Sequence, residues 1–207
     1  MSLPLPPASR AALLAAMDEL HEDAVAAFAA LGFPREVAEA SLADIRRKDE
    51  LYGELVDDGW LIDVFHGRVV TLGRLQFETR AGEQGRGIHI PESGPLAPAS
   101  VDDSLALARK YFGAGETYVC TSWVFDPQLR ALPERSNLRA FAERFEVAPA
   151  EPTEGAVWSL AKFVFRSRPN DVLARGLARD SSALERIAYD VLSQRGTWSE
   201  PTGILKI

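Results

Sequence analysis

The sequence predicts an α+β fold, in which a helical hairpin precedes a mixed sheet flanked by helices. Three observations support this prediction. Apolar residues recur at helical spacing through residues 9–57. The period changes to that of strands at Gly59-Trp60. Beyond that point, strand-like and helix-like segments follow one another to the C-terminus, which is typical of a sheet covered by helices.

Composition limits the class of protein and of ligand. The chain has 207 residues, enough for one good hydrophobic core or two small ones. Its net charge of -7 argues against a general binder of nucleic acids or anionic membranes and suits an amine substrate. Cys120 is the one cysteine, so no intrachain disulfide and no cysteine-based zinc site are possible, and no metal cofactor is expected. With no signal peptide and no membrane span, a cytoplasmic monomer or homodimer is expected.

The first element, residues 9–57, is predicted to be a hairpin of two long helices. Ser9 is a suitable N-cap for the first helix, and Gly32 ends it. Pro34 suits the first turn of the second helix, which Asp57-Asp58-Gly59 would stop. Packing against the sheet is its simplest role, and a lid or partner surface is the alternative.

Two strands are predicted next, at residues 60–65 and 68–79. His66-Gly67 between them has the length of a two-residue hairpin turn. Apolar residues change face within the second strand, and a bulge at Gly73 would return them to one face. The glycine-rich residues 80–87 predict a loop between antiparallel strands. A phosphate-binding loop would have to open a helix, and strand-like residues follow instead.

The central stretch contains a strand, a loop, a helix and a second strand. The strand at 88–91 leads through a loop at 92–100 to a helix at 101–112, and the strand at 117–125 follows. Backbone N–H groups in such a loop point at whatever ligand it holds, which favours an anion. If the two strands lie side by side and diverge, a ligand crevice opens at their carboxyl ends.

Two capping signals help to place the helices around this stretch. Ser100, with Asp103 three residues later, predicts the start of the helix at 101–112. Ser136 predicts the start of the next helix. The other predicted elements are a helix at 137–145, a strand at 156–165, a short helix after Pro169, a strong helix at 181–195 and an edge strand at 203–207.

Four stretches carry a family resemblance across about residues 60–205. They are Leu72-Gly73-Arg74-Leu75-Gln76-Phe77-Glu78, His89-Ile90-Pro91 with Gly94-Pro95-Leu96, Trp123 with Asp126-Pro127, and Ser136-Asn137 with Phe141 and Phe145. In residues, order and spacing they resemble a bacterial family of acyltransferases with a helical N-terminal part and a GNAT-like C-terminal domain.

This resemblance implies a GNAT-like, mostly antiparallel sheet, with a helical hairpin at 1–59 and an acyltransferase domain at 60–207. It implies acyl-CoA, above all acetyl-CoA, as co-substrate and an amine of a small molecule, peptide or protein as acceptor. GNAT enzymes hold the cofactor pyrophosphate on the loop that corresponds to residues 92–100. The residues expected to contact the cofactor are Ser93, Gly94, Leu96, Ser100, Trp123 and Asn137.

The chain departs from the GNAT pattern at two points. The loop at 92–100 lacks the usual Gln/Arg-x-x-Gly-x-Gly signature. Glu143-Arg144-Phe145 stands where many GNAT enzymes carry a tyrosine that serves as the general acid. Both departures favour a second interpretation, a non-catalytic GNAT-like module that binds a ligand or a partner.

Acyl transfer to an amine requires a base that takes the ammonium proton. The candidates are Glu78, His89 and Asp126. Glu78 and His89 would flank one acceptor amine if their side chains face the same side of neighbouring strands. Simpler roles are a core hydrogen bond for His89 and a turn for Asp126. A hydrolytic site of His89 with Cys120 or Ser122 is disfavoured, because no Gly-x-Ser-x-Gly elbow surrounds Ser122.

Overall fold

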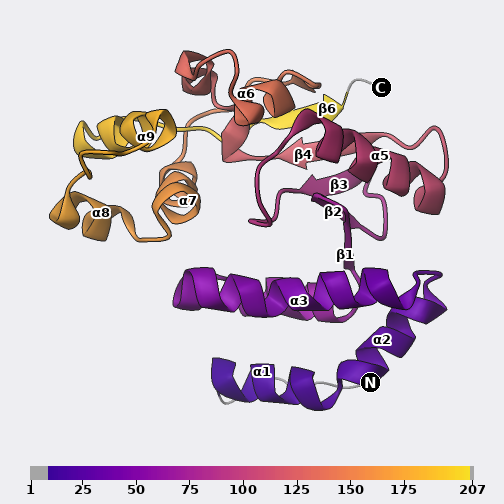
Figure 1. Cartoon of the computed structure of the whole chain (residues 1–207). Helices are drawn as coiled ribbons and strands as arrows, with labels where there is room; N and C mark the ends of the chain where they lie inside the picture. The colour runs from indigo at the N-terminus through magenta and orange to yellow at the C-terminus, as the bar shows by residue number, and fades with distance from the viewer. Residues whose placement is uncertain (1–8, 206–207) are drawn as a thin grey trace.

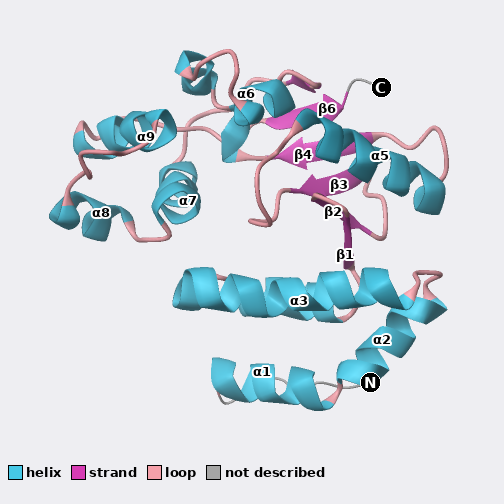
Figure 2. Ribbon diagram, viewed as in Figure 1, coloured by secondary structure: helices cyan, strands magenta, loops and turns pink. Residues whose placement is uncertain are grey.

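The computed structural model describes residues 9–205 and contains six strands in one mixed sheet (Figure 1, Figure 2). The strand order is β1-β2-β3-β4-β6-β5, and β3 and β4 form the parallel pair. The predicted α+β fold with a mostly antiparallel sheet is confirmed. The strands are β1 (Val69–Leu72), β2 (Leu75–Glu78), β3 (Arg86–His89), β4 (Tyr118–Thr121), β5 (Phe145–Val147) and β6 (Thr202–Leu205).

Three helices make up the N-terminal hairpin. Ser9 caps the first as predicted, its hydroxyl accepting a hydrogen bond from the N–H of Ala12. The predicted first helix is broken in two at Leu20. The second predicted helix ends at Tyr52, earlier than predicted, because Gly53, with φ +49°, turns the chain out of the helix. In Figure 1, α3 lies between α1 and the sheet. The helices are α1 (Arg10–Glu19), α2 (His21–Ala30) and α3 (Arg35–Tyr52).

The strand predicted at residues 60–65 is wrong, because α4 (Asp58–Phe65) is a helix. Asp57 caps it, and the carboxylate accepts a hydrogen bond of 2.7 Å from the N–H of Gly59. His66-Gly67 is the exit from this helix and not a hairpin turn, so strand geometry begins at Val69. Three buried residues are spaced as on one helical face: Leu61, Val64 and Phe65.

β1 and β2 form a tight hairpin, and Gly73 lies in its turn rather than in a bulge. Leu72 pairs with Leu75, so two residues connect the strands. Gly73 has φ +65°, and a Cβ atom there would lie 2.8 Å from Oγ of Ser104. The change of apolar face that predicts a bulge is therefore produced by the turn.

β3 and β4 part at their carboxyl ends, as the sequence predicts. Their parallel pairing consists of two residue pairs, the second of which joins Gly87 to Val119. Beyond it, β3 continues along β2 as far as His89, and β4 continues along β6 as far as Thr121. Each strand thus follows its outer neighbour. We call the region between His89 and Thr121 the β3–β4 opening.

Helix α5 (Pro98–Phe112) begins at Pro98 rather than at residue 101, because proline occupies its first position. Ala97 is the N-cap, and no side chain caps the helix. The predicted capping pair Ser100 and Asp103 is therefore wrong. Ser100 lies within the first turn, where its carbonyl accepts a hydrogen bond from the hydroxyl of Ser104.

In the C-terminal part, α7 (Glu154–Phe165) is a helix where the sequence predicts a strand. Thr153 caps it, its hydroxyl accepting a hydrogen bond of 3.0 Å from the N–H of Ala156. β6 lies between β4 and β5 and is not an edge strand, and residues 206–207 of the predicted strand lie outside the described residues. The remaining elements are η1 (Gly53–Leu55), η2 (Trp123–Phe125), η3 (Pro127–Ala131), α6 (Asn137–Ala142), α8 (Pro169–Arg175) and α9 (Ala183–Ser193).

One main hydrophobic core joins the N-terminal helices to the sheet. It runs from Leu13 in α1 through Ile45 in α3 to Leu205 in β6. The helical hairpin therefore packs on the sheet, as predicted. Within residues 9–205, no helix combines the length and the apolar composition needed to cross a bilayer.

Candidate active site

Glu78 and His89 lie side by side on the same face of β2 and β3. Gln76 is the residue directly opposite His89, so Glu78 is its diagonal neighbour. Nε2 of His89 lies 3.3 Å from Oε1 of Glu78. The exposed fractions of the two side chains are 33% for His89 and 44% for Glu78, so a substrate can reach them. The two side chains thus face the same side of neighbouring strands, which is the condition for flanking one acceptor amine, and they form a hydrogen-bonded pair.

The charge of Glu78 determines which nitrogen of His89 carries the proton. The hydrogen bond with His89 lowers the pKa of Glu78, and the positive charge of Arg86 acts in the same direction against desolvation. Glu78 is therefore ionised at neutral pH, and an ionised carboxylate can only accept hydrogen bonds. Nε2 of His89 consequently donates to Glu78, which leaves Nδ1 of a neutral imidazole as a proton acceptor.

Gly87 provides the space that Glu78 occupies. A Cβ atom at position 87 would lie 2.5 Å from Cδ of Glu78 and 2.7 Å from its Oε1. Any side chain at this position would therefore displace the carboxylate. The glycine is required by the close approach of Glu78 and not by its backbone conformation.

Four aromatic side chains, which we call the aromatic wall, lie between His89 and the end of β4, and Lys48 bridges Tyr52 and Trp60, its Nζ lying 5.9 Å and 5.7 Å from their ring centroids. The ring of Trp60 meets that of His89 edge-on, with centroids 4.6 Å apart. Phe163 contacts Tyr52 at 5.8 Å and stacks on Trp123 at 6.3 Å. Sequence reasoning misses Trp60 and Phe163, because both fall in helices read as strands. The aromatic wall consists of Tyr52, Trp60, Trp123 and Phe163.

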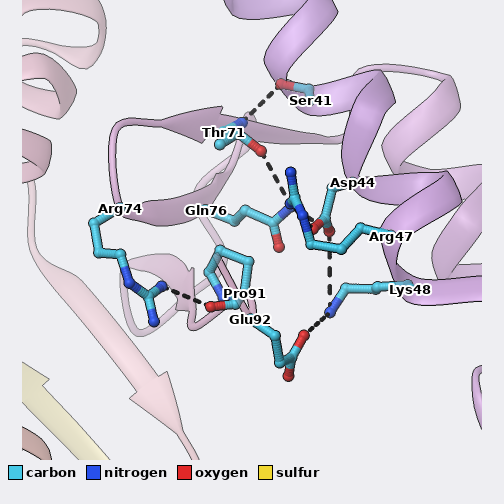
Figure 3. Close-up of polar contacts among 9 residues, drawn as sticks. All are labelled: Ser41, Asp44, Arg47, Lys48, Thr71, Arg74, Gln76, Pro91 and Glu92. Atoms are coloured by element: carbon cyan, nitrogen blue, oxygen red, sulfur yellow. Dashed lines mark hydrogen bonds and ion pairs between the residues drawn. The ribbon is translucent and has the colours of Figure 1, made fainter. Parts of the chain in front are cut away.

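A buried polar network lies behind this face (Figure 3). Asp44 of α3 is fully buried and accepts hydrogen bonds of 2.7 Å from Arg47 and 2.8 Å from Nε2 of Gln76. Gln76 Nε2 also donates to Thr71, so its amide is fixed with Nε2 toward the helix. Nζ of Lys48 lies 4.0 Å from Asp44. The network thus holds α3 against the strand that carries Glu78.

The loop after β3 is fixed by two cations. Arg74 donates hydrogen bonds of 2.6 Å to the carbonyl oxygens of Pro91 and Gly94. Lys48 pairs with Glu92 at 3.2 Å. Figure 3 shows the contacts of Arg74 with Pro91 and of Lys48 with Glu92 at the edge of the polar network. These contacts fix the backbone of the loop that lacks the Gln/Arg-x-x-Gly-x-Gly signature.

The predicted cofactor residues fall into separate environments. Ser93 and Gly94 are exposed in the loop, whereas the side chain of Leu96 is buried in the core. Ser100 lies in the first turn of α5, where no side chain caps the N–H groups. Arg144 reaches this turn and donates to the carbonyl of Pro98. The guanidinium of Arg144 is also paired with Asp102 at 2.5 Å, so an anion at this helix end meets free N–H donors and a cation that already has a carboxylate partner.

The other predicted residues occupy structural positions near η2 and α6. Asp126 is buried, and its carboxylate accepts hydrogen bonds of 2.8 Å from the N–H and hydroxyl of Ser199 and 2.9 Å from the N–H of Gln128. Trp123 belongs to the aromatic wall. Asn137 is exposed at the first position of α6, which Ser136 caps as predicted.

The hydrolytic alternative lacks an activated nucleophile. Burial raises the pKa of Cys120 to about 12, so its thiol is protonated at neutral pH. The hydroxyl oxygen of Ser122 accepts a hydrogen bond from the N–H of Val124 at the start of η2.

A separate cluster consists of His21, Glu22 and Glu39, whose ligand atoms lie close enough together to hold a metal ion. Arg35 pairs with both of its glutamates and supplies the positive charge there.

Comparisons with known proteins agree with this fold. The family model described as GNAT-like C-terminal domain matches residues 69–205, about two thirds of the chain. The crystal structure of an acyltransferase in complex with CoA and 10C-teicoplanin is similar, with a TM-score of 0.76 and 29% identity over 97% of this chain and 70% of that chain. A search of curated proteins gave no match.

Two further solved structures hold acyl-CoA. An acyltransferase with decanoyl-CoA and teicoplanin has a TM-score of 0.73 and 28% identity, over 97% of this chain and 70% of that chain. An acyltransferase mutant with octanoyl-CoA has a TM-score of 0.70 and 27% identity, over 94% and 63%. The family model covers more than half of the sequence. The chain therefore belongs to the GNAT-like acyl-CoA acyltransferase family.

Proposed function

We propose that this protein transfers an acyl group from acyl-CoA to an amine, with His89 as general base and Glu78 as the residue that orients it. The observation that carries the proposal is the Glu78–His89 pair at the β3–β4 opening. Nδ1 of His89 takes a proton from the acceptor ammonium. The neutral amine attacks the thioester carbonyl, the C–N bond forms, and the C–S bond breaks to release CoA thiolate. The imidazolium then returns its proton to that thiolate, and the second proton of the attacking nitrogen is released to solvent as the amide forms.

We propose that the cofactor binds beside this pair. Its phosphates would lie on the N–H groups at the start of α5, next to Arg144, and its pantetheine arm would enter the β3–β4 opening. The thioester then reaches His89. Asp126 has no role in this proposal, because its oxygens are already occupied.

We further propose an acyl chain longer than acetyl and a small-molecule amine as acceptor. The half-buried rings of Trp60, Trp123 and Phe163 in the aromatic wall offer apolar surface for a chain of eight to ten carbons, the length in the acyl-CoAs of two similar structures. The similar acyltransferases that hold teicoplanin or 10C-teicoplanin support a small-molecule acceptor.

A panel of acyl-CoAs from acetyl to decanoyl tests this function. A donor at a hundred times its dissociation constant should raise the free energy of unfolding by about 2.7 kcal/mol, measured as a thermal shift. Octanoyl- and decanoyl-CoA should give larger shifts than acetyl-CoA. Binding without CoA release in the presence of any amine would favour the non-catalytic module, and no binding at all would exclude the acyltransferase.

Replacing Gly87 with alanine should impair catalysis without unfolding the protein. The new Cβ atom pushes the carboxylate of Glu78 away from His89, and a flexible side chain can move aside at little cost. A misplaced orienting group lowers the rate by about tenfold to a hundredfold. We expect a reduced kcat with an unchanged melting temperature. Gly82→Ala, at a glycine outside the site, is the control, and full activity of Gly87→Ala would contradict the role of Glu78.

A further inference from the structure

Arg74 lies in the turn between β1 and β2, and its side chain binds three carbonyl groups of the loop that follows β3. The terminal nitrogens donate hydrogen bonds of 2.6 Å to Pro91 and to Gly94. Nε donates to Gly94 at 3.0 Å and to Pro95 at 3.2 Å. The planar fork of a guanidinium suits several carbonyl groups at once. One side chain therefore sets the orientation of successive peptide groups in this loop.

The fixed carbonyl groups also determine where the N–H groups of the loop point. A trans peptide directs its C=O and its N–H to opposite sides. Because the carbonyls of Pro91 and Pro95 point toward Arg74, the N–H groups of Glu92 and Leu96 point away from it. In the part of the chain that the structure describes, neither N–H donates a hydrogen bond. The loop therefore offers backbone donors to an anion.

The backbone of Arg74 is joined to the start of α5 as well. Its N–H donates a hydrogen bond of 2.7 Å to the hydroxyl of Ser104, and this hydroxyl donates to the carbonyl of Ser100 at 2.8 Å. Ser104 is fully buried, and no side chain caps the N–H groups of α5. Arg74 thus holds the loop and the first helical turn in one arrangement.

Backbone donors bind an anion more tightly when they are already in place, because ordering a loop on binding costs affinity. Building on the acyltransferase function, we propose that Arg74 is a positioning residue for the cofactor. It orders the loop and the start of α5 so that their N–H groups bind the pyrophosphate of CoA, while its own donors stay on the loop carbonyls. The other contact of this loop, between Lys48 and Glu92, joins two side chains and does not fix the peptide groups.

The test compares decanoyl-CoA with decanoyl-pantetheine, which has the same thioester and lacks the nucleotide and its phosphates. Affinities are measured by calorimetry on the full chain, with melting temperatures on the same samples. Arg74→Met, which keeps the apolar stem and removes the guanidinium, should bind decanoyl-CoA about tenfold more weakly and decanoyl-pantetheine as tightly as the wild type. Arg74→Lys should lose the same affinity, because one ammonium group cannot hold several carbonyl groups in a plane.

Two further variants separate positioning from stability. Ser104→Ala removes the hydroxyl that joins Arg74 to α5 and leaves the guanidinium in place, so it should also weaken the binding of decanoyl-CoA alone. Arg10→Met is the matched control, because Arg10 donates to the carbonyl groups of Gly53 and Val56 in the same manner outside the site. It should leave both affinities unchanged, whatever its effect on the melting temperature.

Each other outcome overturns the proposal. Equal affinity of Arg74→Met and the wild type for decanoyl-CoA, or an equal loss for both ligands, removes the positioning role. Full affinity of Arg74→Lys shows that the charge acts directly on a phosphate. If Arg74→Met does not fold, Ser104→Ala decides, and its unchanged affinity for decanoyl-CoA contradicts the proposal. A wild type that binds neither ligand removes the cofactor site and this role of Arg74 with it. The acyltransferase function fails separately, when the wild type binds both ligands but releases no CoA thiol with any amine.

Discussion

His89→Gln should lower acyl-transfer turnover by about a hundredfold or more, while the affinity for acyl-CoA stays nearly unchanged. Glutamine keeps a polar side chain of similar reach but accepts no proton, so the acceptor remains an ammonium ion without a lone pair. His89 lies beside the proposed thioester and not at the phosphate end of the cofactor. Single-turnover release of CoA from decanoyl-CoA, with calorimetry on the same sample, separates the two effects.

Two variants show whether the loss comes from the base. His66→Gln changes another histidine, at the end of α4, and should retain full activity. Glu78→Gln removes the negative acceptor that orients the imidazole and should cost about tenfold to a hundredfold. If His89→Gln lowers the melting temperature but leaves the specific activity of the folded protein unchanged, His89 is a structural residue, and positioning alone must explain catalysis.

Of all parts of the candidate site, the Glu78–His89 pair is the one that the sequence predicts best. Alternation places Glu78 at the end of one strand, and the glycine-rich residues 80–87 predict an antiparallel partner that carries His89. The contact itself depends on register. Pairing of Gln76 with His89 fixes the diagonal that brings the two side chains together, and no local pattern specifies that pairing.

The aromatic wall could not be predicted, because two of its members lie in short apolar runs that fit either period. Residues 60–65 and 156–165 are rich in aromatic and branched residues, which favours strands. Both segments are helices in the structure, because Asp57 and Thr153 cap their first turns and their apolar faces are buried against the core. Local propensity therefore loses to tertiary packing at both segments.

The buried network of α3 did leave a signal in the sequence. Polar residues recur at helical spacing on the face that also carries buried apolar residues. Charged residues on such a face are rarely fully buried without partners, which indicates a polar network. The partners remain invisible, because Gln76 and Glu92 come from other parts of the chain. The residues that carry the signal are Ser41, Asp44, Lys48 and Tyr52.

Asp44→Ala should lower the free energy of unfolding by about 3 kcal/mol or more, a large part of the stability of a typical domain. The carboxylate has no exposed surface, and its removal takes the charged partner from Arg47 and one acceptor from Gln76. Urea denaturation should show a lower midpoint with an unchanged slope. Asp18→Ala, which breaks the exposed pair with Arg46, is the matched control and should cost less than about 1 kcal/mol. Equal losses in the two variants would mean that the buried network does not hold α3 to β2, and the fixed position of Gln76 beside His89 would then need another cause.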